Sequence, residues 1–217
     1  MKHGKLPCVL LTGFDAFGGA SVNPSWLAVQ ALDTQVIAGH TIVAAQLPTE
    51  FEASLIGLKA LLKLHPPALV ICTGQAGGRS AISLERVAIN INDARIADNA
   101  GNQPIDVPVI AGGPAAYFTT LPIKAMLETL IRAGIRAEIS QSAGTFVCNH
   151  VFYGLMQALE GSRRKNICRG GFVHLPCLPE QGSPSMPLPD MVRGLGLMIE
   201  CALNTPHDIV YAAGKVS

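Results

Sequence analysis

Short apolar runs alternate with helix-patterned segments along almost the whole chain. The apolar runs cover residues 8–12, 41–45, 68–73, 135–140 and 171–174, and a further run, whose direction the pattern leaves open, covers 84–91. Helical spacing of apolar residues is seen over 24–32, 50–64, 122–133, 147–160 and 190–203. This alternation is typical of a largely parallel sheet with helices on both faces. We therefore predict the α/β class, as a single-domain α/β/α sandwich over residues 1–217 with a mostly parallel twisted sheet.

Composition and charge exclude several classes of function. With 16 Lys and Arg against 15 Asp and Glu, the chain lacks the basic surface that nucleic-acid binding requires. It contains no apolar run of about 18 residues, and its first apolar run is too short for a signal sequence, so we expect no membrane segment. Only 14% of the residues are charged and the mean hydropathy is +0.35, which predicts an apolar surface buried in a homo-oligomer.

The cysteines indicate the compartment and argue against a metal. The chain has 6 cysteines, which are scattered and form no CxxC pair, so we expect neither a zinc site nor a thioredoxin-type motif. We predict no cofactor of any kind. Thiols without a pairing pattern are typical of a reducing environment, which predicts a cytoplasmic protein.

Cys148 is the first candidate for a catalytic residue. It follows a turn of small residues that begins at Ser142, and it falls in the first turn of the helix predicted from residue 147. Unpaired N–H groups and the helix dipole at that position favour a thiolate, so we expect a thiol that loses its proton easily. The alternative is a buried cysteine that packs as a small hydrophobic residue, as most free cysteines do.

A nucleophilic cysteine needs a base and a group that orients the base. His174 ends a predicted strand and so reaches the edge of the sheet at which α/β proteins bind ligands. His150 is nearer in sequence, but it lies about 200° around the helix from Cys148. Glu85 interrupts an apolar run, where a charge requires a partner, and Asp98 is the alternative for the orienting carboxylate.

The loops after the first and third predicted strands contain unusual residues. Phe14 and Phe17 either plug the core or form the walls of a pocket for a flat ring. The loop 74–79 is rich in glycine, but it matches no phosphate-binding motif and leads into a strand, which argues against nucleotide binding. Its Gln75 offers an amide that can recognise another amide.

Two other loops leave alternatives open. The polar loop 92–106 is either a solvated excursion or part of a ligand shell. The loop 179–187, which follows His174, is either a lid over the substrate or a solvated connector, and loop statistics favour the connector.

Four segments, in order, resemble one known family. They are LLTGFDAFGG with VNPS, GQAGGR with ISLERVAININDARIADNAGNQPID, SAGTFVCNHVFYGLM, and GGFVHLPCLPEQ. Together they resemble the pyroglutamyl peptidase I family of cysteine peptidases over nearly the whole chain. The resemblance implies an exopeptidase that hydrolyses an N-terminal pyroglutamyl residue from peptides through a thioester, without a metal. It implies Cys148 as nucleophile, His174 as base and Glu85 as the residue that orients the base.

The resemblance also implies a substrate pocket and a tetramer. The residues that it places around the lactam ring and the scissile carbonyl are Phe14, Phe17, Gln75, Arg95, Ile96 and Phe146. Arg95 is the one expected near the scissile carbonyl. The chain departs from the family at Ala16, where many members have proline, and at Cys177, where many have tyrosine. We expect both departures to change loop stiffness or packing rather than chemistry.

Overall fold

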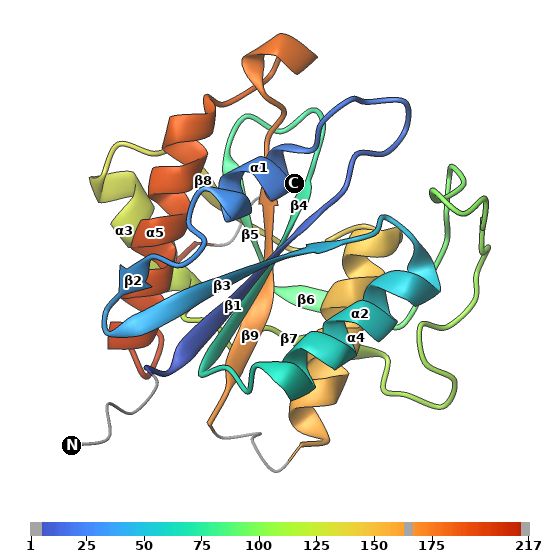
Figure 1. Ribbon diagram of the computed structural model, residues 1–217, viewed down its shortest axis with the longest axis horizontal. Helices are drawn as coiled ribbons and strands as arrows, with labels where there is room; N and C mark the ends of the chain where they lie inside the picture. Colours follow the sequence, from blue (N-terminus) through green and yellow to red (C-terminus); the bar gives the residue numbers. More distant parts are fainter. Residues whose placement is uncertain (1–5, 163–166, 214–217) are drawn as a thin grey trace.

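The computed structural model describes residues 6–162 and 167–213, so parts of the predicted domain, at 1–5, 163–166 and 214–217, lie outside the described residues. Within the described residues a twisted seven-stranded sheet forms the centre (Figure 1). Its strands lie in the order β2 (Val36–Ile37), β3 (His40–Leu47), β1 (Cys8–Phe14), β4 (Leu69–Gln75), β9 (Arg169–Leu175), β5 (Ile82–Glu85) and β8 (Ala137–Ser140).

The sheet is mostly parallel, as the alternating pattern predicts. Strands β3, β1, β4 and β9 run parallel to their neighbours in this group. Strand β2 pairs antiparallel with β3, while β5 pairs antiparallel with β9 and parallel with β8. The carboxyl ends of β1, β4 and β9 therefore meet at one edge of the sheet, which is where folds of this kind bind ligands.

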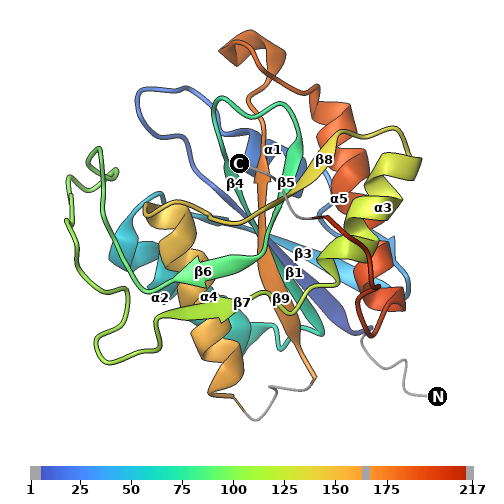
Figure 2. The same cartoon turned by 180° about the vertical axis from the view of Figure 1, so that it is seen from behind.

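Helices cover both faces of the sheet, which confirms the predicted α/β class (Figures 1 and 2). Each face buries its own cluster of apolar side chains. None of the helices in the described ranges is long and apolar enough to cross a membrane. One face carries α1 (Pro24–Gln30), α3 (Ile123–Arg132) and α5 (Leu188–Asn204), and the other carries α2 (Phe51–Leu64) and α4 (Val147–Glu160).

The apolar run at 84–91 is the clearest difference from the sequence prediction. It divides at Arg86 into β5 and a second strand, β6 (Val87–Ile89), which pairs with β7 (Ala116–Phe118) in a separate two-stranded sheet beside α4. The N–H of Arg86 donates to Ser140 and its carbonyl accepts from Thr119, each at 2.9 Å. The backbone of this residue therefore connects the two sheets. The other predicted strands and helices match observed ones with ends that differ by at most two residues.

The loop 92–106 is fastened to the start of α2 by Asp98. Its Oδ2 accepts a hydrogen bond of 3.0 Å from the N–H of Phe51, in a helix whose own N-cap residue makes no side-chain capping bond. Its Oδ1 accepts from the N–H groups of Ala100 and Asn102 at 3.0 and 2.8 Å. Although burial acts in the opposite direction, the bonds from Phe51, Asn102 and Ala100 hold the pKa of Asp98 below its usual value. Backbone groups therefore occupy this carboxylate, which was the alternative to Glu85.

Removal of the Asp98 cap should destabilise the protein. We expect Asp98→Ala to lower the free energy of unfolding by about 1–2 kcal/mol, because the first turn of α2 loses its acceptor. Urea unfolding followed by circular dichroism measures the change. Asp208→Ala is a matched comparison, since Asp208 accepts from the N–H groups of Lys124 and Ala125 at the start of α3, and it should cost a similar amount. An unchanged midpoint and slope for Asp98→Ala would show that the cap contributes nothing.

Candidate active site

Cys148 is delivered to the edge of the sheet by a tight turn before α4. Gly144 in this turn has a φ of +77°, a conformation that residues with a side chain rarely adopt, and its N–H donates to Ser142 Oγ at 3.1 Å. The N-cap residue of α4, Phe146, makes no side-chain capping hydrogen bond. The thiol therefore lies in a helix start whose N-cap supplies no side-chain acceptor for the backbone N–H groups.

Strand register brings His174 beside the thiol. Gly74 in β4 is the register partner of His174 in β9, and paired residues of parallel strands present their side chains to the same face. The sulfur of Cys148 fills the space where Gly74 lacks a side chain, since a Cβ there would lie 2.7 Å from Sγ and 3.0 Å from the ring of Phe172. Cys148 and His174 also line the same cavity. The nucleophile candidate and the base candidate are thus brought together.

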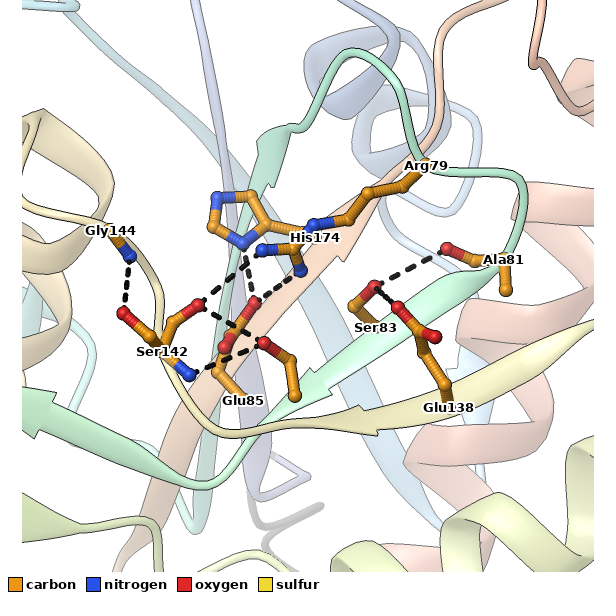
Figure 3. A network of polar contacts seen from close by, with 9 residues as sticks. Arg79, Ala81, Ser83, Glu85, Glu138, Ser142, Gly144 and His174 are labelled. Atoms are coloured by element: carbon orange, nitrogen blue, oxygen red, sulfur yellow. Dashed lines mark hydrogen bonds and ion pairs between the residues drawn. The ribbon is translucent and has the colours of Figure 1, made fainter. Parts of the chain in front are cut away.

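A buried carboxylate orients His174. The Nδ1 atom of His174 donates to Glu85 Oε1 at 2.7 Å (Figure 3). Glu85 has no exposed surface and His174 is only 4% exposed. Because Nδ1 is engaged by Glu85, Nε2 is the ring nitrogen that can exchange a proton with a group in the cavity. The partner that the apolar run around Glu85 requires is therefore present.

Arg79 is a second partner of Glu85, and sequence reasoning missed it. Its Nη1 donates to the same oxygen, Oε1, at 2.7 Å, and its Nη2 donates to the Ser142 carbonyl at 3.4 Å (Figure 3). Glu85 Oε2 has no hydrogen-bond partner among the described residues. A signal was available, because a carboxylate in an apolar strand calls for a cation and Arg79 lies in the loop just before β5.

The electrostatics of the Cys148 thiol differ from the sequence prediction. Burial, followed by the Glu85 carboxylate, raises the pKa of Cys148 to about 12, although Arg79 and the backbone N–H at the helix start act in the opposite direction. The expectation of an easily deprotonated thiol is therefore wrong, because loss of hydration outweighs the helix N-terminus. A thiolate at this position depends on transfer of the proton to a base.

The cavity beside these residues has a volume of about 250 Å³ and an aromatic wall. The rings of Phe17 and Phe146 lie 6.3 Å apart, centroid to centroid, on this wall. Phe14 is only 2% exposed and packs on Phe172, yet it also lines the cavity, so it both plugs the core and forms wall. The lining residues are Phe14, Phe17, Asn23, Thr49, Gln75, Ala76, Gly77, Arg79, Ala143, Gly144, Phe146, Val147, Cys148 and His174.

An amide oxygen in this region has no partner. Gln75 Nε2 donates to Cys177 Sγ at 3.3 Å, whereas the buried Oε1 makes no hydrogen bond within the described residues. An unpaired buried acceptor is costly, so this oxygen suits an N–H group of a ligand. Cys177, one of the two departures from the family pattern, therefore contacts a predicted substrate-binding residue.

The structure does not bring Arg95 and Ile96 to the cavity. Among the residues that it describes, the lining includes neither, and it includes no other residue of the loop 92–106. Arg95 is exposed and Ile96 is half-buried. The loop instead supports the turn before α4, because the N–H of Asp93 donates to the Thr145 carbonyl and Thr145 Oγ1 donates back to the Asp93 carbonyl, at 3.0 and 2.7 Å. The roles of Arg95 and Ile96 in binding stay predictions.

Asn23 and Thr49 are among the lining residues that were not predicted to bind a ligand. Both also hold the loop after β1, since Asn23 Nδ2 and Thr49 Oγ1 donate to the Asp15 carbonyl at 2.9 and 3.2 Å. Asn23 precedes Pro24, which is a sequence signal for the start of a helix and not for binding, and Thr49 carried no signal. Their place at the cavity follows from loop packing.

His150 points to a different part of the core. Its Nδ1 lies 3.1 Å from Asn92 Oδ1, and its ring packs edge-on against Phe51 with centroids 5.5 Å apart. Burial lowers the pKa of His150 to about 4, and Lys59 acts in the same direction. These contacts support the argument that His150 is not the base for Cys148.

The loop after His174 is held at several points. The N–H of Met186 donates to the Cys177 carbonyl at 2.9 Å, and Gln181 Nε2 donates to the Val22 carbonyl at 3.1 Å. Arg136 Nη2 donates to the Ser185 carbonyl at 2.9 Å. These bonds favour the connector over the lid.

A larger hollow of about 420 Å³ lies between the C-terminal ends of α2 and α4. Its described lining includes Cys168, Lys59 and Lys63 but neither a histidine nor a carboxylate. Size alone therefore does not identify the site, and the chemistry favours the smaller cavity.

Comparison with known proteins identifies the same family that the sequence motifs resemble. A family model described as pyroglutamyl peptidase matches residues 7–205. The chain is 55% identical to pyrrolidone-carboxylate peptidase 1 of Ralstonia nicotianae over 97% of this chain and 100% of that protein. It is 52% identical to the pyrrolidone-carboxylate peptidase of Bacillus thuringiensis subsp. konkukian over 95% of this chain and 97% of that protein.

Solved structures of pyroglutamyl peptidases have the same fold as this chain. The crystal structure of pyroglutamyl peptidase I from Bacillus amyloliquefaciens superposes with a TM-score of 0.91 at 48% identity, over 96% of this chain and 100% of that one. The pyrrolidone carboxyl peptidase from Thermococcus litoralis superposes with a TM-score of 0.90 at 35% identity, over 95% of this chain and 100% of that one.

The neutral imidazole of His150 should make stability fall at acid pH. Because its pKa falls from 6.5 to about 4 on folding, its contribution is complete above pH 6.5 and is lost as the pH falls through 4. This difference between the two pKa values of His150 corresponds to roughly 3 kcal/mol of folding free energy. We expect the free energy of unfolding in urea to depend less steeply on pH between 4 and 6.5 in His150→Gln. His207→Gln, at an exposed position, is the control. If the free energy of unfolding of His150→Gln depended on pH as steeply as that of the parent, a neutral buried ring would be contradicted.

Proposed function

This chain belongs to the pyroglutamyl peptidase family, and from that premise we propose that it is a cysteine exopeptidase that hydrolyses N-terminal pyroglutamyl residues from peptides. The observation that carries the proposal is the buried Glu85–His174 pair beside Cys148, at a cavity with an aromatic wall. This is the arrangement that acyl transfer by a thiol requires: a nucleophile, a base and a group that orients the base.

In the proposed mechanism, His174 Nε2 takes the proton of Cys148 as the sulfur attacks the carbonyl that joins pyroglutamate to the next residue. The tetrahedral intermediate then expels the peptide amine, which receives that proton from His174, and a thioester remains on Cys148. His174 next deprotonates a water that hydrolyses the thioester, which releases pyroglutamate and restores the thiol. Glu85 holds the ring and stabilises the imidazolium. The raised pKa of Cys148 explains why the thiol needs this base.

The oxyanion of each tetrahedral intermediate needs hydrogen-bond donors. We assign one to the backbone N–H of Cys148, in a helix start whose N-cap residue supplies no side-chain acceptor. For the second donor we keep Arg95 or a group near it. Arg95 is exposed on a loop that binds the turn before Cys148.

The pyroglutamyl ring is flat, neutral and carries an amide. The aromatic side chains of Phe14, Phe17 and Phe146 suit its faces. Its lactam N–H suits the unpartnered Oε1 of Gln75. We also keep Ile96 as a residue that contributes apolar surface on the substrate side.

We further propose that the enzyme is a homo-oligomer, a tetramer as the family resemblance implies, and that it acts in the cytoplasm. Large apolar side chains support an assembly, since Ile56, Leu64 and Phe118 are 68%, 71% and 70% exposed. Cys8, Cys72, Cys148, Cys177 and Cys201 form no disulfide within the described residues, which suits a reducing compartment.

Substitution of the catalytic residues tests the mechanism. Cys148→Ala should abolish release of a chromophore from a pyroglutamyl amide, and His174→Ala should cost about as much because the two act as a unit. Glu85→Gln should cost less, since the ring remains. Cys72→Ala and Cys8→Ala should keep turnover. Equal losses in Cys148→Ala and Cys72→Ala, with both variants folded by circular dichroism, would remove Cys148 from its role.

Substrate selectivity tests the pocket independently of the nucleophile. A prolyl residue lacks the ring carbonyl and carries a charged amine, which would find no water and no carboxylate between the aromatic rings. We therefore expect kcat/KM for pyroglutamyl amides to exceed that for prolyl amides by on the order of 10⁴. Gln75→Ala and Phe17→Ala should reduce this ratio while Cys148 still reacts with iodoacetamide. Similar rates on both substrates would overturn the pocket assignment.

A further inference from the structure

The proposed mechanism leaves one charged residue of the site, Arg79, without a role. Arg79 lines the cavity, and its side chain is 28% exposed while its partner Glu85 is fully buried. The guanidinium and the His174 ring both bind Oε1 of Glu85, each at 2.7 Å. A single carboxylate oxygen therefore serves two donors, one of them a permanent cation.

A permanent cation is needed at this place because His174 changes its charge during the reaction. While His174 is neutral, the buried Glu85 carboxylate would be an uncompensated charge without Arg79, and such a charge is strongly destabilising. Glu85 would then draw a proton onto His174 or take one up itself, and in either case His174 would no longer be free to accept the proton of Cys148.

We propose that Arg79 is a positioning residue whose charge balances Glu85 while His174 is neutral and favours the Cys148 thiolate once His174 takes the proton. The inference rests on the proposed function, since it assigns Cys148 and His174 their roles. The charges then alternate along the four groups: arginine positive, glutamate negative, imidazolium positive and thiolate negative. The lowering effect of Arg79 on the pKa of Cys148 agrees with this direction.

Arg79 also bonds the turn that delivers the nucleophile. Its Nη2 donates to the carbonyl of Ser142, whose hydroxyl accepts from the N–H of Gly144 (Figure 3). Loss of this contact alone would misplace the thiol without altering any charge. The experiment must therefore separate a charge effect from a purely structural effect of Arg79.

The other titratable groups on the surrounding elements are the same in every variant of the test. They are Asp15 after β1, Cys72 on β4, Glu138 on β8, His150 on α4 and Cys177 after β9. Cys72 acts on the Cys148 thiol electrostatically, and Glu138 binds Ser83 Oγ, two residues from Glu85 on β5. Because none of them is changed, a shift in the pH profile between variants reports on residue 79.

The pH profile of kcat/KM on a pyroglutamyl amide shows in which direction Arg79 moves the apparent pKa values of the Cys148–His174 pair. A nearby positive charge favours loss of every proton around it, so its removal raises each apparent pKa of the Cys148–His174 pair. We expect both limbs of the bell-shaped profile to move to higher pH in Arg79→Gln, by about one unit. On the acid limb, kcat/KM then falls about tenfold at a fixed pH. Arg79→Lys keeps the charge, so its limbs should stay at the parent pH even if the maximum falls.

Arg132→Gln is the matched control, because it also removes one arginine from an ion pair with a glutamate, at 2.6 Å, but on the exposed face of α3. Its profile should equal that of the parent. A lower maximum with unmoved limbs in Arg79→Gln would overturn the inference and leave Arg79 as a support for the turn. Limbs that move equally in Arg79→Lys would overturn it as well, and this variant retains the test if Arg79→Gln fails to fold.

Alkylation of Cys148 separates this inference from the proposed function. The rate of its modification by iodoacetamide, followed by mass spectrometry across pH, requires no peptidase substrate. We expect the alkylation profile to shift to higher pH in Arg79→Gln and to keep its position in Arg79→Lys and Arg132→Gln. If no pyroglutamyl amide is cleaved, the proposed function fails while this profile still decides the role of Arg79. An unshifted alkylation profile in folded Arg79→Gln overturns that role whatever the substrate.

Discussion

The Glu85 carboxylate, which has no solvent-exposed surface, is the constraint on which the site depends. A charge in such surroundings is retained only with partners, and these come from β9 and from the loop before β5. Because β5 pairs antiparallel with β9, Ser83 lies opposite His174. Glu85 lies two residues further along β5, away from the carboxyl end of β9, and reaches the imidazole from there. The burial of Glu85 thus requires β9 and the loop before β5 to pack around the same carboxylate.

The regular elements could be predicted because their signals are local. A turn such as Asn23-Pro24 marks the start of α1, and apolar periodicity places α4 with the observed ends. The break at Arg86 could not be predicted, because the same apolar residues suit one long strand or two short ones. The choice depends on which backbone groups pair with Arg86: the Ser140 carbonyl accepts from its N–H, and the Thr119 N–H donates to its carbonyl. That information is tertiary.

The site shows the same division between residue type and environment. Motif and position singled out Cys148, His174 and Glu85, whereas the roles of the neighbours depended on packing. Asp98 carries the same chemical group as Glu85, yet it caps a helix. The helix start that favours a thiolate at Cys148 is real, but the depth of the thiol beside Glu85 reverses the outcome. The sequence identifies the chemical groups of the site, but their exposure to water depends on how the fold packs around them.

The place of β9 in the sheet has a consequence for the order in which the protein is made. Strand β9 lies between β4 and β5, although it is the last strand of the described chain to be synthesised. Until it emerges from the ribosome, β4 has one unpaired edge and the β5–β8 pair has no sheet to join, and such edges are where incomplete chains associate wrongly. His174 lies on that same strand. Cys148 therefore has no base to take its proton until β9 joins the sheet and completes the site.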